Sequence, residues 1–183
     1  MRLSGRRLTL ALTTVLVVVL AVGATAAWSI GRHREVQPAA MADYQAGPTT
    51  DGTVRVSTEA ARHDKAPQVQ AVMQQYFDAI NDRDYQSWIG AVADSQAAPQ
   101  TEARWNQDYA STVDSNLSVL AIDNEPLRAR MVFTSQQAVE LAPPSLPVDC
   151  INWDVTYLLS EQNGHLVLSG IDPSAQSMTA CYS

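Results

Sequence analysis

A long uncharged stretch near the N-terminus constrains this chain more than any other feature. From Leu8 to Ile30 the sequence consists mainly of Leu, Val and Ala and contains no charged residue. A hydrocarbon core about 30 Å thick needs roughly 20 helical residues to cross it, and a helix satisfies its own backbone hydrogen bonds there. The stretch is therefore expected to be a transmembrane helix, with residues 1–7 as a short cytoplasmic tail.

The basic residues that flank this stretch predict its orientation. Three Arg and the terminal amine precede it and two Arg follow it, so the positive-inside rule places the N-terminus in the cytoplasm by a narrow margin. The alternative is a cleaved signal peptide, because Ala24-Thr25-Ala26 has the A-x-A form of a cleavage site. The apolar run exceeds the usual 7–15-residue signal-peptide core, which favours a single-pass anchor in the cell membrane over a secreted protein. In both cases the rest of the chain is expected outside the cytoplasm.

The charge of the chain changes sharply along its length. Residues 1–34 carry five Arg and no acid, whereas residues 66–183 carry 14 Asp or Glu against four Arg. An acidic domain repels phosphate backbones, so nucleic acid is not an expected partner; the same charge also keeps an exported domain soluble. Residues 31–65 are polar, contain turn-forming Gly and Pro, and are expected to be a flexible linker. His33 and His63 in this tract lack a second ligand at metal-binding spacing and are expected to be solvated.

Residues 66–183 are expected to form one domain that begins with helices. Pro67 is a favoured first helical residue, and apolar residues follow from Val69 to Ile80 with helical spacing. Asp84 is a good N-cap for a second helix. Residues 94–99 are expected to be a loop, and a weaker four-residue spacing after it predicts a third helix from Trp105, Tyr109 and Val113.

The apolar period then changes from helical spacing to two, which indicates strands. Strands are expected at residues 117–122, 127–133, 151–159 and 166–171, the last ending at Asp172-Pro173. Asn163-Gly164 is a strong hairpin-turn signal. With Asn163 and Gly164 in the turn, the numbers of paired residues sum to 327, which puts Cys150 opposite residue 177, close to Cys181. Because an even cysteine pair outside the cytoplasm predicts a disulfide, we expect a Cys150–Cys181 bond.

Two segments, Val72–Tyr85 and Trp153–Leu159, resemble the NTF2-like (cone-fold) superfamily, which also contains ketosteroid isomerase and SnoaL-type cyclases. The likeness covers about residues 67–172. With the anchor in front, the layout is similar to that of Mce-associated membrane proteins and VirB8-like components of secretion systems. The resemblance implies an α+β domain, with three N-terminal helices packed on a curved antiparallel sheet and one transmembrane helix before it. A pocket in such a cone would be lined by Tyr76, Trp88, Trp105, Met131, Phe133, Trp153, Val155 and Tyr157.

No motif in the sequence identifies a chemical reaction. The chain lacks a cysteine or histidine pair at zinc spacing, a Gly-rich phosphate loop and a G-x-S-x-G elbow. Asp154 alternates with the aromatic face of its strand and is expected to point outward as a solvated carboxylate, and His165 beside the turn is expected to be exposed. We therefore expect no catalytic, metal-binding or cofactor-binding residue and no cofactor.

Three functional hypotheses remain open on the sequence alone. The first is a non-catalytic accessory or assembly module that binds protein partners at the membrane, for instance in a transport or secretion complex. The second is a cone that binds a small apolar ligand. The third is an isomerase or dehydratase-like enzyme, which would need a buried Asp, Glu or His. A homodimer is compatible with each of them.

Overall fold

A computed structural model of the chain describes residues 52–181. The expected membrane anchor Leu8–Ile30, the tail before it and most of the expected linker lie outside these residues. No helix between residues 52 and 181 combines the length and the apolar character that crossing a bilayer requires.

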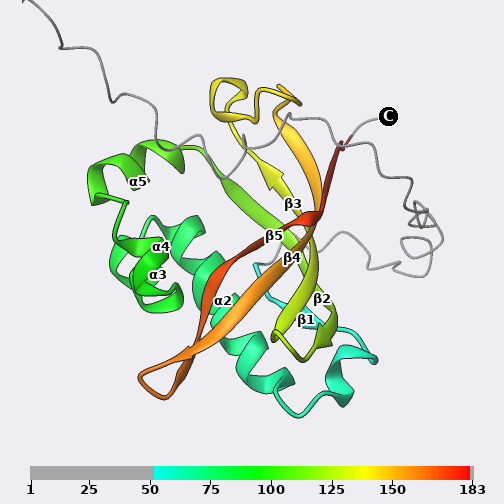
Figure 1. Cartoon of the computed structure of the whole chain (residues 1–183). Helices are drawn as coiled ribbons and strands as arrows, with labels where there is room; N and C mark the ends of the chain where they lie inside the picture. Colours follow the sequence, from blue (N-terminus) through cyan, green and yellow to red (C-terminus); the bar gives the residue numbers. More distant parts are fainter. Residues whose placement is uncertain (1–51, 182–183) are drawn as a thin grey trace, which may run out of the picture. The chain divides into compact units, whose positions relative to one another are not determined.

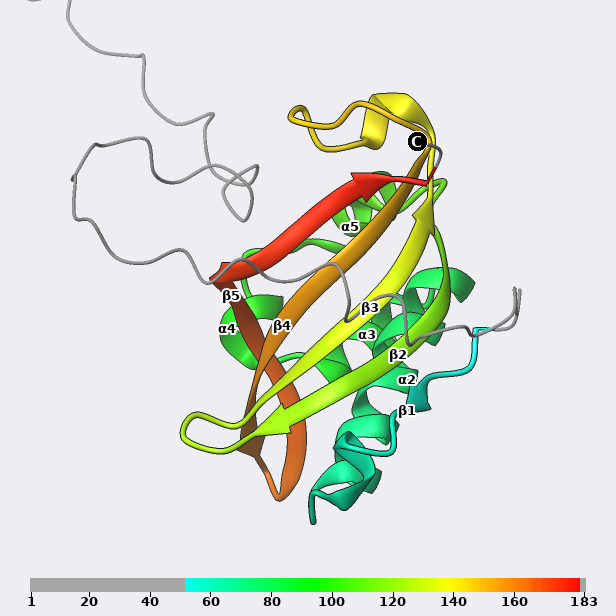
Figure 2. The ribbon, with the colours of Figure 1, turned by 90° about the vertical axis from the view of Figure 1, so that its right-hand side faces the viewer.

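This part of the chain has the expected α+β architecture, with helices packed on one face of a twisted sheet (Figures 1 and 2). The five strands are ordered β1-β2-β3-β4-β5, and all neighbours are antiparallel except β1, which is parallel to β2. The strands are β1 (Arg55–Val56), β2 (Val113–Asp123), β3 (Arg128–Gln136), β4 (Cys150–Gln162) and β5 (His165–Ala180). The helices are α2 (Ala66–Asp82), α3 (Tyr85–Ala91), α4 (Asp94–Ala97) and α5 (Glu102–Asp108), with 3₁₀ turns η1 (Ala60–Arg62) and η2 (Val139–Leu141).

The helix signals in the sequence are largely confirmed. Pro67 lies in the first turn of α2, and the Asp84 side chain caps α3 by accepting a hydrogen bond from the Ser87 amide. Two details differ from the expectation. The short helix α4 forms within the expected loop 94–99, so four α-helices precede β2 in the described residues. Val113 does not continue the third helix but begins β2.

The folded domain begins earlier than the expected linker boundary at Lys65. Val54 is fully buried, and its backbone is held by two glutamines of α2. The Val54 amide donates to Gln74 Oε1 at 2.7 Å, and Gln70 Nε2 donates to the Val54 carbonyl at 2.8 Å. These partners are distant in sequence, so local apolar periodicity does not reveal them.

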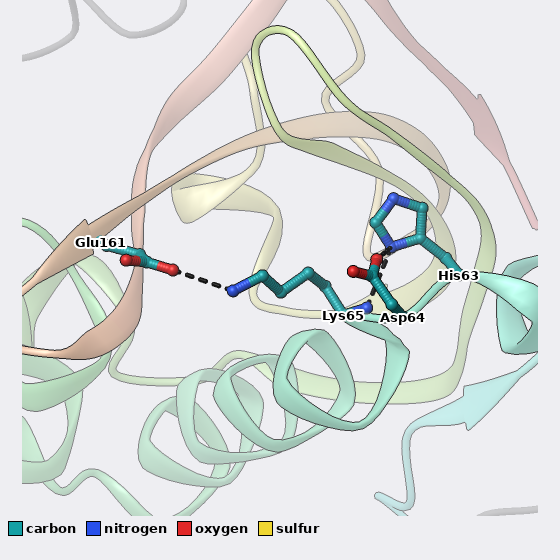
Figure 3. Close-up of polar contacts among 4 residues, drawn as sticks. All are labelled: His63, Asp64, Lys65 and Glu161. Carbon is teal, nitrogen blue, oxygen red and sulfur yellow. Dashed lines mark hydrogen bonds and ion pairs between the residues drawn. The ribbon is translucent and has the colours of Figure 1, made fainter.

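His63 is mostly buried, whereas the sequence predicts that it is solvated. Only 13% of its side chain is exposed, and its Nδ1 accepts a hydrogen bond from the Lys65 amide at 3.1 Å (Figure 3). Nδ1 also lies 3.2 Å from a carboxylate oxygen of Asp64. The imidazole thus shapes the turn that leads into α2, which is a structural role.

The β4–β5 hairpin departs from simple pairing, and this corrects the expected end of the last strand. Gln162 pairs with His165 as the Asn163-Gly164 turn predicts, but two irregularities shift the register farther along. The larger one lies between Tyr157↔Ile171 and Val155↔Gln176. Pro173 falls within this bulge, where it need not donate to the sheet. Strand β5 therefore continues past Asp172-Pro173 to Ala180.

Candidate functional site

The eight residues expected to line a pocket lie in or against the hydrophobic core. Six of them are buried in the core and two, Tyr76 and Trp153, are partly buried and pack against it. The interior is built from edge-to-face rings, such as Phe77 with Phe133 at 5.0 Å between ring centroids and Tyr76 with Tyr157 at 5.9 Å. Edge-to-face contacts of this kind add stability beyond their buried area. None of the eight lines either of the two pockets described next.

A groove of about 650 Å³ opens between α2, α3 and the β4–β5 hairpin. We call it the hairpin groove. Its apolar lining consists of Ala71, Val72, Ile89, Val92, Leu166 and Val167. Its remaining lining consists of Gln68, Gln75, Gly90, Asp94, Glu161, Gln162, Asn163, Gly164 and His165. Its size falls in the range of ligand sites, and the mixture of apolar surface with a few polar groups is typical of binding sites.

Hydrogen bonds from the backbone between α3 and α4 hold one wall of the hairpin groove in place. Val92 forms a parallel bridge with Leu168, and the Ala93 amide donates to the Leu168 carbonyl at 2.8 Å. The Asp94 amide donates to Gln162 Oε1 at 3.2 Å. The connection from α3 to α4 is therefore bonded directly to the hairpin, so the groove has a defined shape.

An ion pair joins the start of α2 to the hairpin. Lys65 Nζ lies 2.9 Å from Glu161 Oε1 (Figure 3). The hydrogen bond from Lys65 lowers the pKa of Glu161, and the same bond raises the pKa of Lys65. Both side chains are substantially exposed, at 33% and 65%, so solvent screens the pair and it contributes little to stability. In the hairpin groove, the positive charge of Lys65 offsets the negative charge of Glu161. Asp94, which also lines the groove, has no ion-pair partner within residues 52–181.

A second pocket of about 430 Å³ shares Ala71 and Gln75 with the hairpin groove and continues between α2 and α3. Three carboxylates line it, those of Asp78, Asp82 and Asp84, and its lining contains no Lys, Arg or His from the described part of the chain. The Ser87 hydroxyl and amide lower the pKa of Asp84, which caps α3. Exposed carboxylates are common on protein surfaces. Here they extend the negative charge of the neighbouring hairpin groove.

One buried acid, Asp114, was not expected from the sequence. Its residue surface is only 4% exposed, and it accepts a hydrogen bond from the equally buried Ser135 hydroxyl. Burial raises the pKa of Asp114 to about 6, although the Ser135 hydroxyl and the charge of Arg83 act in the opposite direction. Its backbone is clamped to the end of α2, because its amide donates to Asn81 Oδ1 at 2.7 Å and its carbonyl accepts from Asn81 Nδ2 at 2.9 Å.

Three tyrosines belong to the same interior region. Burial raises the pKa of Tyr76, Tyr109 and Tyr157, and the negative charge of Asp114 adds to the effect on each. All three phenols therefore stay neutral at physiological pH. A buried carboxyl beside neutral phenols is a combination that acid–base chemistry can use, but Asp114 lines neither of the two pockets.

The other polar candidates from the sequence are Asp154 and His165. Asp154 is on the outer face of the sheet as expected, but it is paired rather than solvated: Arg130 Nε and Nη2 donate to its two carboxylate oxygens at 2.9 and 2.6 Å. His165 is exposed as expected and lines the hairpin groove. Within residues 52–181 no group of three or more His, Cys, Asp or Glu is placed to hold a metal ion.

Comparison with known proteins finds no related protein. No protein-family model matches the chain, and neither the curated proteins nor the solved structures contain a match. Function is therefore inferred from the sequence pattern and the geometry.

Proposed function

We propose that this chain is a membrane-anchored, extracytoplasmic accessory module without catalytic activity, which binds a protein partner in the hairpin groove as part of a transport or secretion complex. The anchor expected at Leu8–Ile30 and the NTF2-like order of helices followed by sheet support this proposal. The observation that carries it is the groove itself, an open concavity of about 650 Å³ with apolar surface in its lining.

The distribution of side chains favours the groove over the interior as a binding site. The aromatic residues that could have lined a cone are used for core packing. In the groove, by contrast, Ile89 and Leu166 remain partly exposed. Partly exposed apolar side chains enclosed by polar ones are typical of protein interaction sites.

The charges of the groove indicate what kind of partner segment it accepts. Glu161 is already paired with Lys65, Asp94 has no such partner among the described residues, and three further carboxylates line the adjoining pocket. A segment with apolar anchors and basic or amide-bearing flanks complements this surface, because potentials of opposite sign favour association.

Site-specific photo-crosslinking in membranes tests the proposal. A photoreactive residue at Gln68, an exposed lining residue of the groove, is expected to trap a discrete protein, whereas the same residue at Gln107, exposed on α5 outside both pockets, is not. The substitution Ala71→Trp, at an exposed lining position, is expected to abolish the product by filling the groove. Identical products from Gln68 and Gln107, or products that survive Ala71→Trp, contradict the proposal.

A second candidate function is supported by Asp114. A buried carboxyl with a pKa raised to about 6 is the kind of group an isomerase or dehydratase needs, and a cone that binds a small apolar ligand could contain it. Native mass spectrometry of the full chain in detergent separates these alternatives from the first proposal. A retained small molecule that is lost in Asp114→Asn would favour interior binding, and a ligand-free spectrum for both proteins favours the accessory module.

A further inference from the structure

Among residues 52–181, the second half of β5 has no neighbouring strand on its outer side and forms a free sheet edge. Strand β5 is last in the order β1-β2-β3-β4-β5, and Figure 2 shows its C-terminal half along the border of the sheet. The first half is covered, because Val92 bridges to Leu168 and Gln96 Nε2 donates to the Ser169 carbonyl at 3.1 Å. No such cover from residues 52–181 reaches Ser174–Ala180.

The register determines which backbone groups face this free edge. The Cys181 amide donates to the Cys150 carbonyl at 3.1 Å, and the two Cα atoms are 5.5 Å apart. This is the spacing of a hydrogen-bonded pair in an antiparallel ladder. Because such pairs alternate along the strands, the amides and carbonyls of Gln176, Met178 and Ala180 point away from β4. Each has no hydrogen-bond partner in the described part of the chain.

The side chains of this segment do not protect the edge. Natural sheets blunt their edges with charged residues, proline or a covering loop. Residues 174–180 contain no charged residue and no proline. Met178 is opposite Trp153, a partly exposed ring that stacks on Phe133 at 6.2 Å. The edge therefore combines unpaired backbone groups with a small apolar surface.

We propose that two copies of this chain pair through Gln176–Ala180 in antiparallel fashion about a twofold axis at Met178. In this register Met178 faces Met178 of the partner subunit, and Gln176 faces the partner's Ala180, so all outward-facing backbone groups find outward-facing partners. A twofold axis makes one surface complementary to itself. The proposal does not depend on the hairpin groove or on its occupant.

Charge explains why this segment suits a second copy. Residues 66–183 carry 14 acids against four Arg, so two such domains have the same sign of net charge and repel each other. The neutral edge is a place where two copies can approach without opposing carboxylates on the paired segments. A short strand pair is weak on its own, and anchoring in one membrane would raise the effective concentration of the copies.

Cysteine crosslinking of the full chain in liposomes tests the register. Met178→Cys is expected to form a disulfide between the introduced cysteines of two copies under mild oxidation, because a hydrogen-bonded pair lies within the Cα range of a disulfide. Ser177→Cys alone should form at least fivefold less, since Ser177 faces the partner's Thr179, whereas a mixture of Ser177→Cys and Thr179→Cys should crosslink. Peptide mapping distinguishes these products from exchange with the native disulfide. Equal crosslinking of Met178→Cys and Ser177→Cys, or none, overturns the proposal.

Proline substitutions provide a matched control for the direction of the backbone groups. Association can be measured as fluorescence energy transfer between copies that carry donor and acceptor dyes. Met178→Pro removes an outward amide, so this energy transfer should fall to background while the melting temperature changes little. Thr179→Pro removes an inward amide that faces Asn152 and should lower the melting temperature. Undiminished energy transfer in Met178→Pro overturns the proposal.

Discussion

Cys181 lies directly opposite Cys150 because β5 contains four more residues than simple pairing about its turn allows. The numbers of paired residues sum to 327 beside the turn, where Gln162 pairs with His165, and to 331 at the far end of the hairpin, where Ile151 pairs with Ala180. This shift of four converts the expected partner of Cys150, residue 177, into Cys181. The two cysteines form a disulfide with a sequence separation of 31.

Removing this disulfide is expected to destabilise the domain. The bond closes a loop of about 30 residues, and the chain-entropy model assigns roughly 3–4 kcal/mol to such a loop. The double substitution Cys150→Ser with Cys181→Ser should lower the free energy of unfolding by that order in urea titrations. Reductant should shift the unmodified protein similarly and leave the double variant unchanged. A reductant-insensitive midpoint for the unmodified protein would contradict the expectation.

Asp114 is expected to make the domain more stable in mild acid. Burial raises its pKa from 3.8 to about 6, so the folded state binds the proton more tightly than the unfolded state. Its favourable contribution is complete below about pH 4 and is lost as pH rises from 4 to 6, by about 3 kcal/mol at most. Asp114→Asn should flatten this part of the profile of unfolding free energy against pH. The exposed Asp78→Asn is the control and should keep the slope; an unchanged slope in Asp114→Asn would count against burial as the cause.

Gly90→Ala is expected to stabilise α3 slightly. Alanine is favoured over glycine in helices by up to about 1 kcal/mol. The new Cβ would come within 2.8 Å of Gln75 Nε2, which currently donates to the Ser87 carbonyl at 2.9 Å. Gln75 is exposed, so its amide can move at the loss of one solvent-exposed bond. Thermal melts should show a net gain of roughly 0.5 kcal/mol, and Gln75→Ala combined with Gly90→Ala should gain at least as much. A net loss in both variants would mean that the backbone of α3 is displaced.

Breaking the Arg130–Asp154 pair is expected to weaken the β3–β4 ladder modestly. The hydrogen bond from Arg130 to Asp154 raises the pKa of Arg130, and the pair has bidentate geometry on half-buried side chains. Asp154→Asn should lower the free energy of unfolding by roughly 1 kcal/mol. Arg130→Lys keeps the positive charge but cannot make both hydrogen bonds of the guanidinium group. It should therefore retain only part of the coupling energy with Asp154. A double-mutant cycle in low and high salt measures that coupling, and a value near zero would show that the geometry is not maintained in solution.

The late start expected for β2 and the early end expected for β5 share one cause, which is irregular pairing. Strand β2 has register shifts between Ser115 and Ser118 and between Val119 and Ala121. They interrupt the alternation of apolar and polar residues, so the strand was expected only from Leu117 and the inward direction of Asp114 was not visible. The pocket lining stays a prediction of the resemblance. Which aromatic residues touch one another depends on how α2 and α5 pack on the sheet, and all eight expected lining residues belong to the core or pack against it.

Local chemistry in the sequence was sufficient for the α+β order, the start of α2, the cap of α3, the hairpin turn and the pairing of the only two cysteines. These features depend on neighbouring residues, whose spacing and backbone preferences act over short distances. Only the tertiary structure decided the bulges, the burial of Asp114 and His63, the hairpin groove and the free edge of β5. Each of these arises where segments distant in sequence meet, and a one-residue change in register there reverses which side chains face the core.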